Sequence, residues 1–335
     1  MRLTRLATVW ARGIGQMRRP FLAAAFPMLF VVSGGAGAQP APVPGDALPS
    51  RFPAAPRVVA IGDVHGDLDA TRRALRLAGA IDAQDRWVGG RLVVVQVGDQ
   101  LDRGDEERAI LHLFDRLAHE AAAAGGAFHA LNGNHELMNA LLDLRYVTEG
   151  GFGDFGDVGS ALHASDSALF AYHAAQRGRV VAFRPGGEYA RLLSERNTIA
   201  MVGGDLFVHG GVLPDHAAHG IERINAEIRA WLRGDAPPPP WVRGADSPTW
   251  TRVYSTEVGA EACATLTQAL ATVGARRMIV GHSVHRQGVT SYCDGRVWAI
   301  DVGLGKAYGG PMEVLEIRGD STTVLRDGAP RARGR

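Results

Sequence analysis

Six residues with metal-ligating side chains each follow a short apolar run: Asp63, His65, Asp99, Asn134, His209 and His282. Carboxylate, imidazole and amide donors together suit two divalent ions of intermediate hardness, such as Mn, Fe or Zn. Asp99 is the natural bridge, because one carboxylate can bind two ions. Two ions about 3.5–4 Å apart stabilise both the attacking and the leaving oxygen of an in-line displacement at phosphorus. A bridging water loses its proton near neutral pH and becomes the nucleophile. The six residues therefore predict hydrolysis of a phosphoester.

Glycine-bearing turns hold all six residues. The turns are GDVHG at 62–66, GDQLDRG at 98–104, NGNHE at 132–136, HGG at 209–211 and GH at 281–282. The apolar runs before them cover 57–61, 91–97, 127–131, 205–208 and 277–280. Short runs of this composition are typical of strands buried on both faces. The flanking glycines let the backbone turn sharply and leave room for ions.

Helical patterns follow most of these strands, at 68–78, 106–124, 221–232 and 261–273. Alternation of strand and helix predicts an α/β fold with a sheet between helices. Further strands at 290–301 and 312–317 indicate a second sheet. Ligands of such sheets collect beyond the carboxyl ends of the strands. We therefore expect the five motifs to meet at one edge.

Two segments interrupt this pattern inside a domain that we predict over 57–328. Residues 146–197 hold glycines, histidines and a helical middle at 165–176, and we expect an insertion over the site. Residues 234–256 contain the stiff proline run at 237–240 and form another insertion. The end, 329–335, is predicted to be a disordered basic tail.

The first 38 residues have the three parts of a secretory signal. Five arginines and no acid come first, an apolar run covers 21–32, and small residues at 36–38 predict cleavage after Ala38. The Arg18-Arg19 pair resembles the twin-arginine export motif, while an ordinary Sec signal and an uncleaved anchor remain open. Residues 39–56 are predicted to be a proline-rich tether. We expect a periplasmic or secreted protein with no stable membrane insertion after cleavage.

Composition excludes several classes of protein. The 335 residues are 46% hydrophobic and 21% charged, which excludes a wholly disordered, collagen-like or multispanning chain. A formal charge of +1 provides no basic field for nucleic acid. Cys263 and Cys293 fit either a disulfide or two buried thiols, and neither begins a CxxxxxR signature of thiol-based tyrosine phosphatases.

In their order, the five motifs resemble the phosphoprotein phosphatase (PPP) family of metallophosphoesterases, over about Arg57 to Gly310. Details resemble the bacterial-origin Shewanella-like phosphatases within it. These details are Gln100, Met138-Asn139, RYVT at 145–148, DVG at 301–303 and AYGG at 307–310. The resemblance implies a calcineurin-like fold, a two-sheet β-sandwich flanked by helices with a dimetal site at the strand ends.

The resemblance also implies roles for single residues. Asp63, His65 and Asp99 would bind the first metal; Asp99, Asn134, His209 and His282 would bind the second. His135 resembles the general acid, and Asp102 its carboxylate partner, which raises the pKa of the imidazole. Arg103 and Arg252 resemble clamps on the phosphate, to which Asn134 also contributes, and Tyr308 would line the pocket. Direct attack by metal-bound hydroxide, without a phosphoenzyme, is the implied mechanism.

Several alternatives stay open at this stage. Arg103 and Arg252 also fit surface salt bridges, and Glu136 fits either a partner behind the ligands or a carboxylate at a helix N-terminus. The expected substrate is a phosphoprotein or phosphopeptide, on phosphotyrosine, phosphoserine or phosphothreonine. A dinucleoside polyphosphate hydrolase would share the site, and a non-catalytic metal- or phosphate-binding protein is a third possibility. The intact pair of His135 and Asp102 argues against the last.

Overall fold

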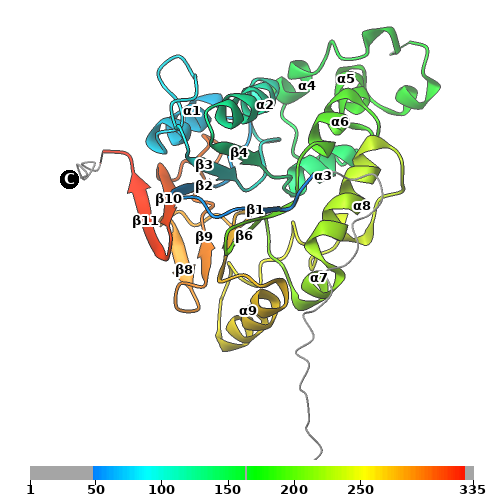
Figure 1. Cartoon of the computed structure of the whole chain (residues 1–335). Helices are drawn as coiled ribbons and strands as arrows, with labels where there is room; N and C mark the ends of the chain where they lie inside the picture. Colours follow the sequence, from blue (N-terminus) through cyan, green and yellow to red (C-terminus); the bar gives the residue numbers. More distant parts are fainter. Residues whose placement is uncertain (1–47, 163, 329–335) are drawn as a thin grey trace, which may run out of the picture. The chain divides into compact units, whose positions relative to one another are not determined.

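Two β-sheets face each other in the computed structural model, which describes residues 48–162 and 164–328 (Figure 1). Apolar side chains of both sheets form the core between them, including Ala60 and Val95 from one sheet and Phe207 and Ile279 from the other. The predicted signal segment, the first part of the predicted tether and the predicted tail lie outside the described residues. In the described part of the chain no helix combines the length and apolarity needed to cross a membrane.

The first sheet has five strands in the order β11-β10-β2-β3-β4. Their bounds are β2 Val58–Ile61, β3 Val93–Gln96, β4 Ala127–Ala130, β10 Glu313–Arg318 and β11 Ser321–Arg326. Strands β2, β3 and β4 are parallel, with Val58 opposite Val93 and Val93 opposite Ala127. All three thus point their carboxyl ends the same way, as the motif analysis requires.

The second sheet has six strands in the order β1-β5-β6-β7-β9-β8. Their bounds are β1 Arg51–Phe52, β5 Ile199–Val202, β6 Asp205–Val208, β7 Arg277–Val280, β8 Thr290–Tyr292 and β9 Val297–Ala299. Strands β6, β7 and β9 are parallel. The two late segments predicted to form the second sheet belong to different sheets, because β8 and β9 extend β7 while β10 pairs with β2.

Strand β1 lies within residues 39–56, which the sequence analysis assigned to a tether. Arg51 and Phe52 pair in parallel with Met201 and Val202 of β5. The Arg51 side chain is held by an ion pair with Glu222 of 2.6 Å. An unpaired edge of β5 would leave a row of exposed backbone groups, and β1 satisfies part of it. The folded domain therefore includes residues upstream of the predicted start at 57.

Helices cover the outer face of each sheet (Figure 1). Helices α1 (Leu68–Leu77) and α2 (Glu107–Ala123) pack on the first sheet. On the second sheet pack α7 (Pro214–His219), α8 (Ile221–Arg233) and α9 (Ala260–Val273). The short helix α3 (Asn134–Ala140) follows β4 directly. These elements confirm the predicted α/β sandwich.

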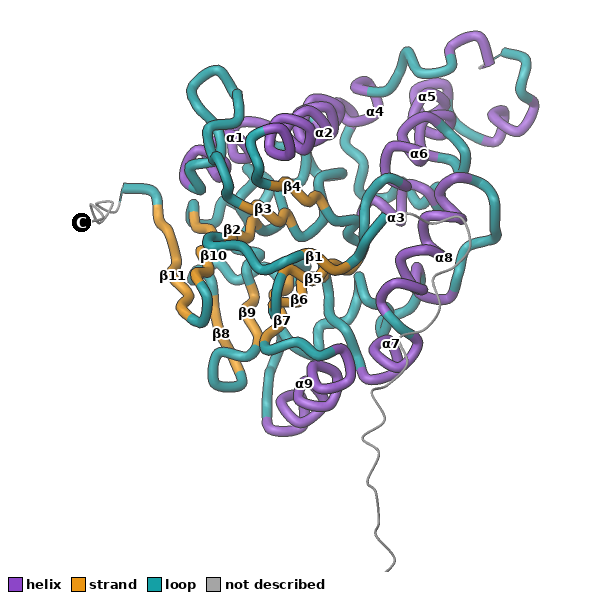
Figure 2. Tube along the Cα trace, viewed as in Figure 1, coloured by secondary structure: helices purple, strands orange, loops and turns teal. Residues whose placement is uncertain are grey.

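The insertion at 146–197 is a set of short helices joined by loops (Figure 2). They are α4 (Glu149–Asp154), η1 (Ser160–Leu162), η2 (Ser167–Ala171), α5 (Ala174–Phe183) and α6 (Glu188–Ser194). The predicted helical middle at 165–176 is instead divided, because Tyr172 and His173 have extended backbone between η2 and α5. Phe155, Phe183 and Tyr189 pack together with ring centroids 4.8–5.7 Å apart, inside the core that the second sheet shares. The insertion is thus packed into the domain.

The other insertion, at 234–256, contains the short η3 helix (Pro240–Val242).

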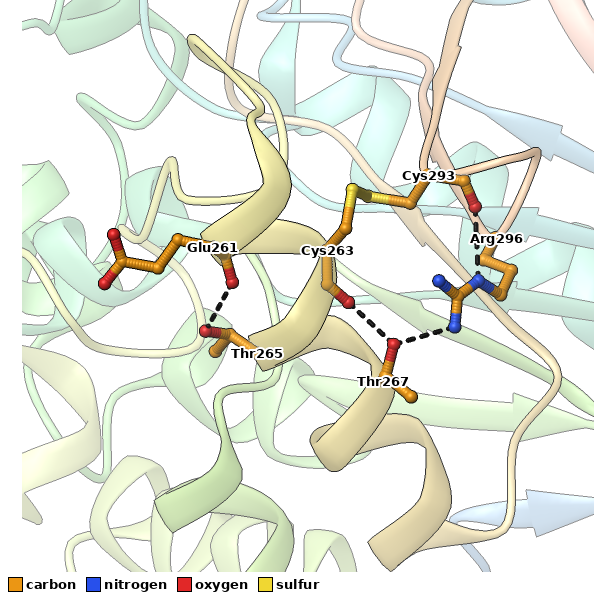
Figure 3. The surroundings of a disulfide bond; sticks show 6 residues. All are labelled: Glu261, Cys263, Thr265, Thr267, Cys293 and Arg296. Carbon is orange, nitrogen blue, oxygen red and sulfur yellow. Dashed lines mark hydrogen bonds between the residues drawn. A yellow bond between two sulfur atoms is a disulfide. The ribbon is translucent and has the colours of Figure 1, made fainter.

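Cys263 and Cys293 form a disulfide, which settles the alternative left open by the sequence (Figure 3). The bond joins α9 to the turn between β8 and β9, with the two Cα atoms 5.4 Å apart. Thr267 reinforces this link, since its hydroxyl donates to the Cys263 carbonyl and accepts from Arg296, each at 2.7 Å. The disulfide therefore ties a surface helix to the edge hairpin of the second sheet.

Candidate active site

The carboxyl ends of strands from both sheets bring the predicted ligands together. Asp63 follows β2, Asp99 follows β3, and Asn134 begins α3 after β4. From the second sheet, His209 follows β6 and His282 follows β7. These side chains, together with His65, are all buried. Residues up to 219 positions apart in sequence are thus adjacent in space.

Asp99 lies at the centre of the cluster. Its Oδ2 is 3.1 Å from His209 Nε2 and 3.8 Å from His65 Nε2. His209 Nε2 is also 2.9 Å from the side-chain oxygen of Asn134. Asp63 completes the group, because its Oδ2 accepts a hydrogen bond from the backbone N–H of His282 at 3.1 Å and lies 4.0 Å from His65 Nε2. All six predicted ligands therefore meet at one place.

Two overlapping groups of these side chains have the spacing of a metal site. One consists of His65, Asp99 and His135, and the other of Asp99, His209 and His282, with the ligand atoms of each group within 4.8 Å of one another. Asp99 belongs to both, as a carboxylate that bridges two ions must. His282 Nε2 is buried and has no hydrogen-bond partner among the described residues. A bound cation would satisfy this orphaned lone pair.

Backbone carbonyls fix which ring nitrogen faces the cluster. His65 Nδ1 lies 3.0 Å from the carbonyl oxygen of Leu101, and His209 Nδ1 lies 3.0 Å from that of Val97. A carbonyl only accepts, so in each neutral ring Nδ1 carries the proton and Nε2 offers a lone pair. His209 Nε2 then faces the oxygens of Asp99 and Asn134, and three lone pairs meet at a point that a cation would stabilise. The donor set fits divalent metal ions.

The histidines divide into two kinds by their pKa. Burial lowers the pKa of His65 to about 4, and burial together with His209 lowers the pKa of His282 to about 2. Both rings are neutral at pH 7, as metal ligands must be. Burial also acts to lower the pKa of His135, but Asp99 and the hydrogen bond to Asp102 outweigh it and raise the pKa above its usual value. His135 is therefore suited to hold a proton rather than a metal.

Three buried carboxylates crowd this edge of the sheets. Burial acts to raise the pKa of Asp99, but His209 and His135 hold it well below its usual value. Burial, then the charges of Asp301 and Asp99, raise the pKa of Asp63. Asp301, which the sequence analysis noted only inside a motif, follows β9, and burial raises its pKa to about 6. Divalent cations would relieve the repulsion within this group.

The backbone of the site is strained at several of these positions. Asp99 and His282 have left-handed φ values of 58° and 68°, and His65, Asp102 and Arg103 are also left-handed. Non-glycine residues adopt this region at an energetic cost, and such residues cluster at functional sites. Gly133 allows the close approach, because a Cβ there would fall on the Asp99 carboxylate. The fold thus maintains an unfavourable local backbone in order to hold the ligands.

Glu136 fixes the loop that carries Asp99. Its buried carboxylate accepts backbone N–H bonds from Asp99, Gln100 and Leu101 at 2.8, 2.8 and 3.1 Å, and from Gly133 at 2.7 Å. The two roles considered for Glu136 are therefore both present: it caps the N-terminus of α3 and it supports a candidate ligand.

His135 and Asp102 form a hydrogen-bonded pair beside the ligands. His135 Nδ1 donates to Asp102 Oδ2 at 2.6 Å, and His135 Nε2 lies 3.7 Å from Asp99 Oδ2. Burial acts to raise the pKa of Asp102, but the hydrogen bond from His135 and nearby charges lower it. A buried imidazole that donates to a carboxylate in this way can supply a proton from its other nitrogen to a leaving oxygen.

Two tyrosines flank the guanidinium of Arg103. Its Cζ lies 4.4 Å from the ring centroid of Tyr146 and 5.3 Å from that of Tyr308. Arg103 Nε is buried without a hydrogen-bond partner among the described residues. Tyr146 was not among the predicted site residues, although it lies in the RYVT segment at 145–148. The rings stack on the faces of the guanidinium and leave its N–H edges available.

Arg252 also reaches the site, from the insertion at 234–256. Its Nη1 donates to the carbonyl of His282 at 3.1 Å and to the hydroxyl of Ser283 at 2.8 Å. These contacts tie Arg252 to the loop that carries the candidate ligand His282. Arg252 itself is exposed.

A cavity of about 640 Å³ opens beside the cluster. His65 and Arg103 line it, and so do the acidic residues Asp105, Glu106 and Glu149. A group bound at the ligands can therefore extend into open space that the insertion borders.

Known proteins resemble the chain over most of its length. The family model for calcineurin-like phosphoesterases matches residues 56–286. The chain is 42% identical to Shewanella-like protein phosphatase 2 of Arabidopsis thaliana, over 82% of this chain and 78% of that protein. It is 28% identical to Shewanella-like protein phosphatase 1 of Plasmodium berghei, over 74% and 67% of the two chains.

Solved protein structures also resemble this chain over most of its length. A cold-active protein tyrosine phosphatase superposes with a TM-score of 0.68 at 26% identity, covering 84% of this chain and 80% of that one. A crystal structure of the cold-active protein-tyrosine phosphatase of a psychrophilic Shewanella gives 0.65 at 25% identity, with 83% of each chain covered.

The chain therefore belongs to the calcineurin-like phosphoesterases and, among them, to the Shewanella-like protein phosphatases. It is a hydrolase of a dimetal-dependent family, and the resemblance noted in the sequence is confirmed.

Proposed function

We propose that the chain removes phosphate from phosphotyrosine, phosphoserine or phosphothreonine in proteins or peptides. The residues of the cluster would bind the metal ions, donate a proton and hold the phosphate. The observation that carries the proposal is the buried cluster in which Asp99 is shared by two groups of potential ligands, with the ring of His135 held by Asp102 at its edge. The names of the Arabidopsis and Shewanella relatives support phosphoprotein as the substrate class.

Two metal ions would be held by the residues of the cluster. Asp63, His65 and Asp99 would bind one ion, and Asp99, Asn134, His209 and His282 the other. The mixed oxygen and nitrogen donors favour Mn, Fe or Zn. When bound, such cations lower the pKa of water and withdraw negative charge from phosphoryl oxygens.

His135 acts as the general acid in this proposal. Asp102 orients the ring through Nδ1, so that Nε2 delivers a proton to the departing alkoxide or phenolate. An alkoxide is the poorer leaving group, and its release depends more on this proton.

Arg103 and Arg252 hold the phosphoryl oxygens. A guanidinium matches two phosphoryl oxygens with its N–H edges. Tyr146 and Tyr308 keep the plane of Arg103 in place, and the Nδ2 amide of Asn134 provides a further donor.

We also propose that the chain is exported to the periplasm or the medium. Residues 1–38 support export as a signal, and the disulfide between Cys263 and Cys293 is the kind of bond that persists in oxidising compartments. Mass spectrometry of the mature N-terminus from exported material tests this; a chain retained with Met1 in the cytoplasm contradicts it.

Three substrates compared side by side test the proposed activity. We expect turnover of a phosphotyrosine or a phosphoserine peptide with Mn²⁺, loss of turnover with chelator, and slower hydrolysis of diadenosine tetraphosphate. Preference for the dinucleotide over both peptides would instead identify a dinucleoside polyphosphate hydrolase. Absence of metal-dependent turnover on all three, with p-nitrophenyl phosphate as a further substrate, would identify a binding protein.

A further inference from the structure

A completely buried arginine of the insertion contacts the carboxylate partner of the proposed general acid. Arg179 lies on α5, and its Nη2 donates to Asp102 Oδ1 at 3.0 Å. Both side chains have 0% relative exposure. Nothing in the local sequence marks Arg179 among the other arginines of the chain, and it was not among the predicted site residues.

The remaining donors of Arg179 join three other elements. Its Nε donates to the side-chain oxygen of Asn139 on α3 at 2.7 Å, and its Nη1 donates to the carbonyl of Gly151 on α4 at 2.9 Å. Glu107 on α2 accepts from both Nη1 and Nη2. A desolvated guanidinium is tolerated only when its donors are satisfied in this way.

The two oxygens of Asp102 receive different donors. Oδ1 accepts from Arg179 and from Asn139 Nδ2, each at 3.0 Å, while Oδ2 accepts from His135 alone among the described residues. Two donors on one oxygen stop the carboxylate from rotating about its Cβ–Cγ bond, so Oδ2 stays directed at His135 Nδ1. Asn139 is itself held by Arg179, which makes the guanidinium the common support of both donors.

We propose that Arg179 is a positioning residue for catalysis: it orients Asp102, and through Asp102 the ring of His135, towards the leaving group. The proposal rests on the proposed role of His135 as general acid. It means that the insertion at 146–197 supplies part of the proton-donating machinery, and does not only border the cavity. Misplacement of such a group by about 1 Å is enough to reduce turnover by about 10²-fold.

A purely structural role is the alternative to exclude. Arg179 could serve only to neutralise the buried Glu107. Burial raises the pKa of Glu107 to about 7 even with Arg179 beside it, so without the guanidinium this carboxyl takes up a proton. The double variant Arg179→Met with Glu107→Gln removes both charges together, and the amide oxygen introduced by Glu107→Gln can still accept from the backbone N–H of Asp102. A structural role predicts that this double variant recovers wild-type behaviour.

The experiment compares the double variant with wild type on two substrates. We expect kcat for a phosphoserine peptide to fall about 10- to 100-fold, because the alkoxide needs a positioned proton donor. Turnover of p-nitrophenyl phosphate should stay close to wild type, because nitrophenolate leaves with little help. Metal content, measured by elemental analysis, should be unchanged. The control is Arg184→Met, which removes an ion pair of 2.6 Å with Asp166 inside the same insertion; it should match wild type on both substrates.

A spectroscopic readout separates positioning from folding. In zinc-loaded protein, the proton shared by His135 Nδ1 and Asp102 should give a downfield NMR signal that shifts or broadens in the double variant and not in Arg184→Met. Arg179→Lys keeps a charge in the buried site without the forked contact, and it should show an intermediate loss on the phosphoserine peptide. Full phosphoserine turnover with an unchanged proton signal, in the double variant or in Arg179→Lys, overturns the proposal.

Failure of this proposal and failure of the proposed function give different results. If His135→Asn leaves phosphoserine turnover intact, the general-acid assignment itself is wrong. If His135→Asn is inactive on phosphoserine while the double variant equals wild type, only the role of Arg179 is wrong.

Discussion

The strand-end cluster and the buried cluster around Arg179 satisfy their polar atoms in opposite ways. At the strand ends, His282 Nε2 and Asp301 Oδ2 lack hydrogen-bond partners among the described residues, and carboxylates crowd one another. Around Arg179, each nitrogen of the guanidinium donates to an oxygen of a neighbouring residue. Both clusters are buried and charged, so burial alone does not distinguish them.

The difference between the two clusters indicates which of them binds a ligand. Unsatisfied buried lone pairs and strained backbone are costly, and they persist where a ligand compensates for them. A fully hydrogen-bonded ion network needs no ligand and rigidifies its surroundings. We therefore interpret the strand ends as the site of chemistry and the Arg179 cluster as the support of its proton donor.

Asp99→Asn should have the largest effect. It removes the carboxylate shared by both ligand groups, so metal content should fall and turnover should drop by about 10³-fold or more, since metal ions contribute several kcal/mol to such reactions. Elemental analysis with kinetics on p-nitrophenyl phosphate measures both. Asp320→Asn, at a side chain with 92% exposure, is the control. Full metal content with wild-type kcat in Asp99→Asn would contradict the bridging role.

His135→Asn should keep metal and lose turnover. Removal of a general acid costs about 10²–10⁴-fold, and the loss should be greater for a phosphoserine peptide than for p-nitrophenyl phosphate. His119→Asn, at an exposed position of α2, should behave as wild type. Loss of metal from His135→Asn would instead place this ring among the metal ligands. The ring lies close enough to Asp99 and His65 for that role.

Arg103→Met should weaken both phosphate binding and catalysis. A charge-assisted hydrogen bond contributes about 1.5–3 kcal/mol, so kcat/KM should fall about 10- to 100-fold. The inhibition constant of inorganic phosphate should rise in parallel. Arg145→Met, which removes a surface pair with Asp143, provides the comparison. Equal phosphate inhibition in Arg103→Met and wild type would show that the guanidinium does not contact the phosphoryl group.

The disulfide should affect stability and not chemistry. Replacement of Cys263 and Cys293 by serine should lower the free energy of unfolding by about 2–4 kcal/mol. Denaturant unfolding measures this loss, and kcat of the folded double variant should equal that of wild type. A fall in kcat at full folding would connect the edge hairpin to the site.

His129 should produce a smaller effect, which depends on pH. Burial lowers the pKa of its ring to about 4 from the usual 6.5, and the ring centroid lies 4.0 Å from that of Phe52. As the pH falls, the unfolded chain therefore binds a proton at this histidine before the folded chain does. The stability that the neutral ring contributes is lost as the pH falls from about 6.5 through about 4. Denaturant unfolding of His129→Gln should show a shallower loss over that range. An unchanged slope would mean that the ring titrates normally.

The sequence predicted the strand-end cluster because its information is local. Each candidate ligand follows a buried strand within a glycine-bearing turn, and parallel strands such as β2 and β3 must end at the same edge. The fold class follows from the same alternation of strands and helices.

Other features could not be predicted because they depend on tertiary packing. Arg179 looks like any helical arginine until α5 packs against α3 and the guanidinium reaches Glu107 on α2. The two residues of β1 are too few to show the pattern of a strand. They form one because they pair with the edge of β5. Tyr146 lies in a noted segment, but its stacking on Arg103 follows from the return of the chain after α3.

Anomalous diffraction from metal-loaded crystals tests the central claim most directly. We expect two peaks bridged by Asp99, one beside Asp63 and His65 and the other beside Asn134, His209 and His282, with His135 bonded to neither. One peak alone, or a peak whose ligands include His135 and exclude His282, would contradict it.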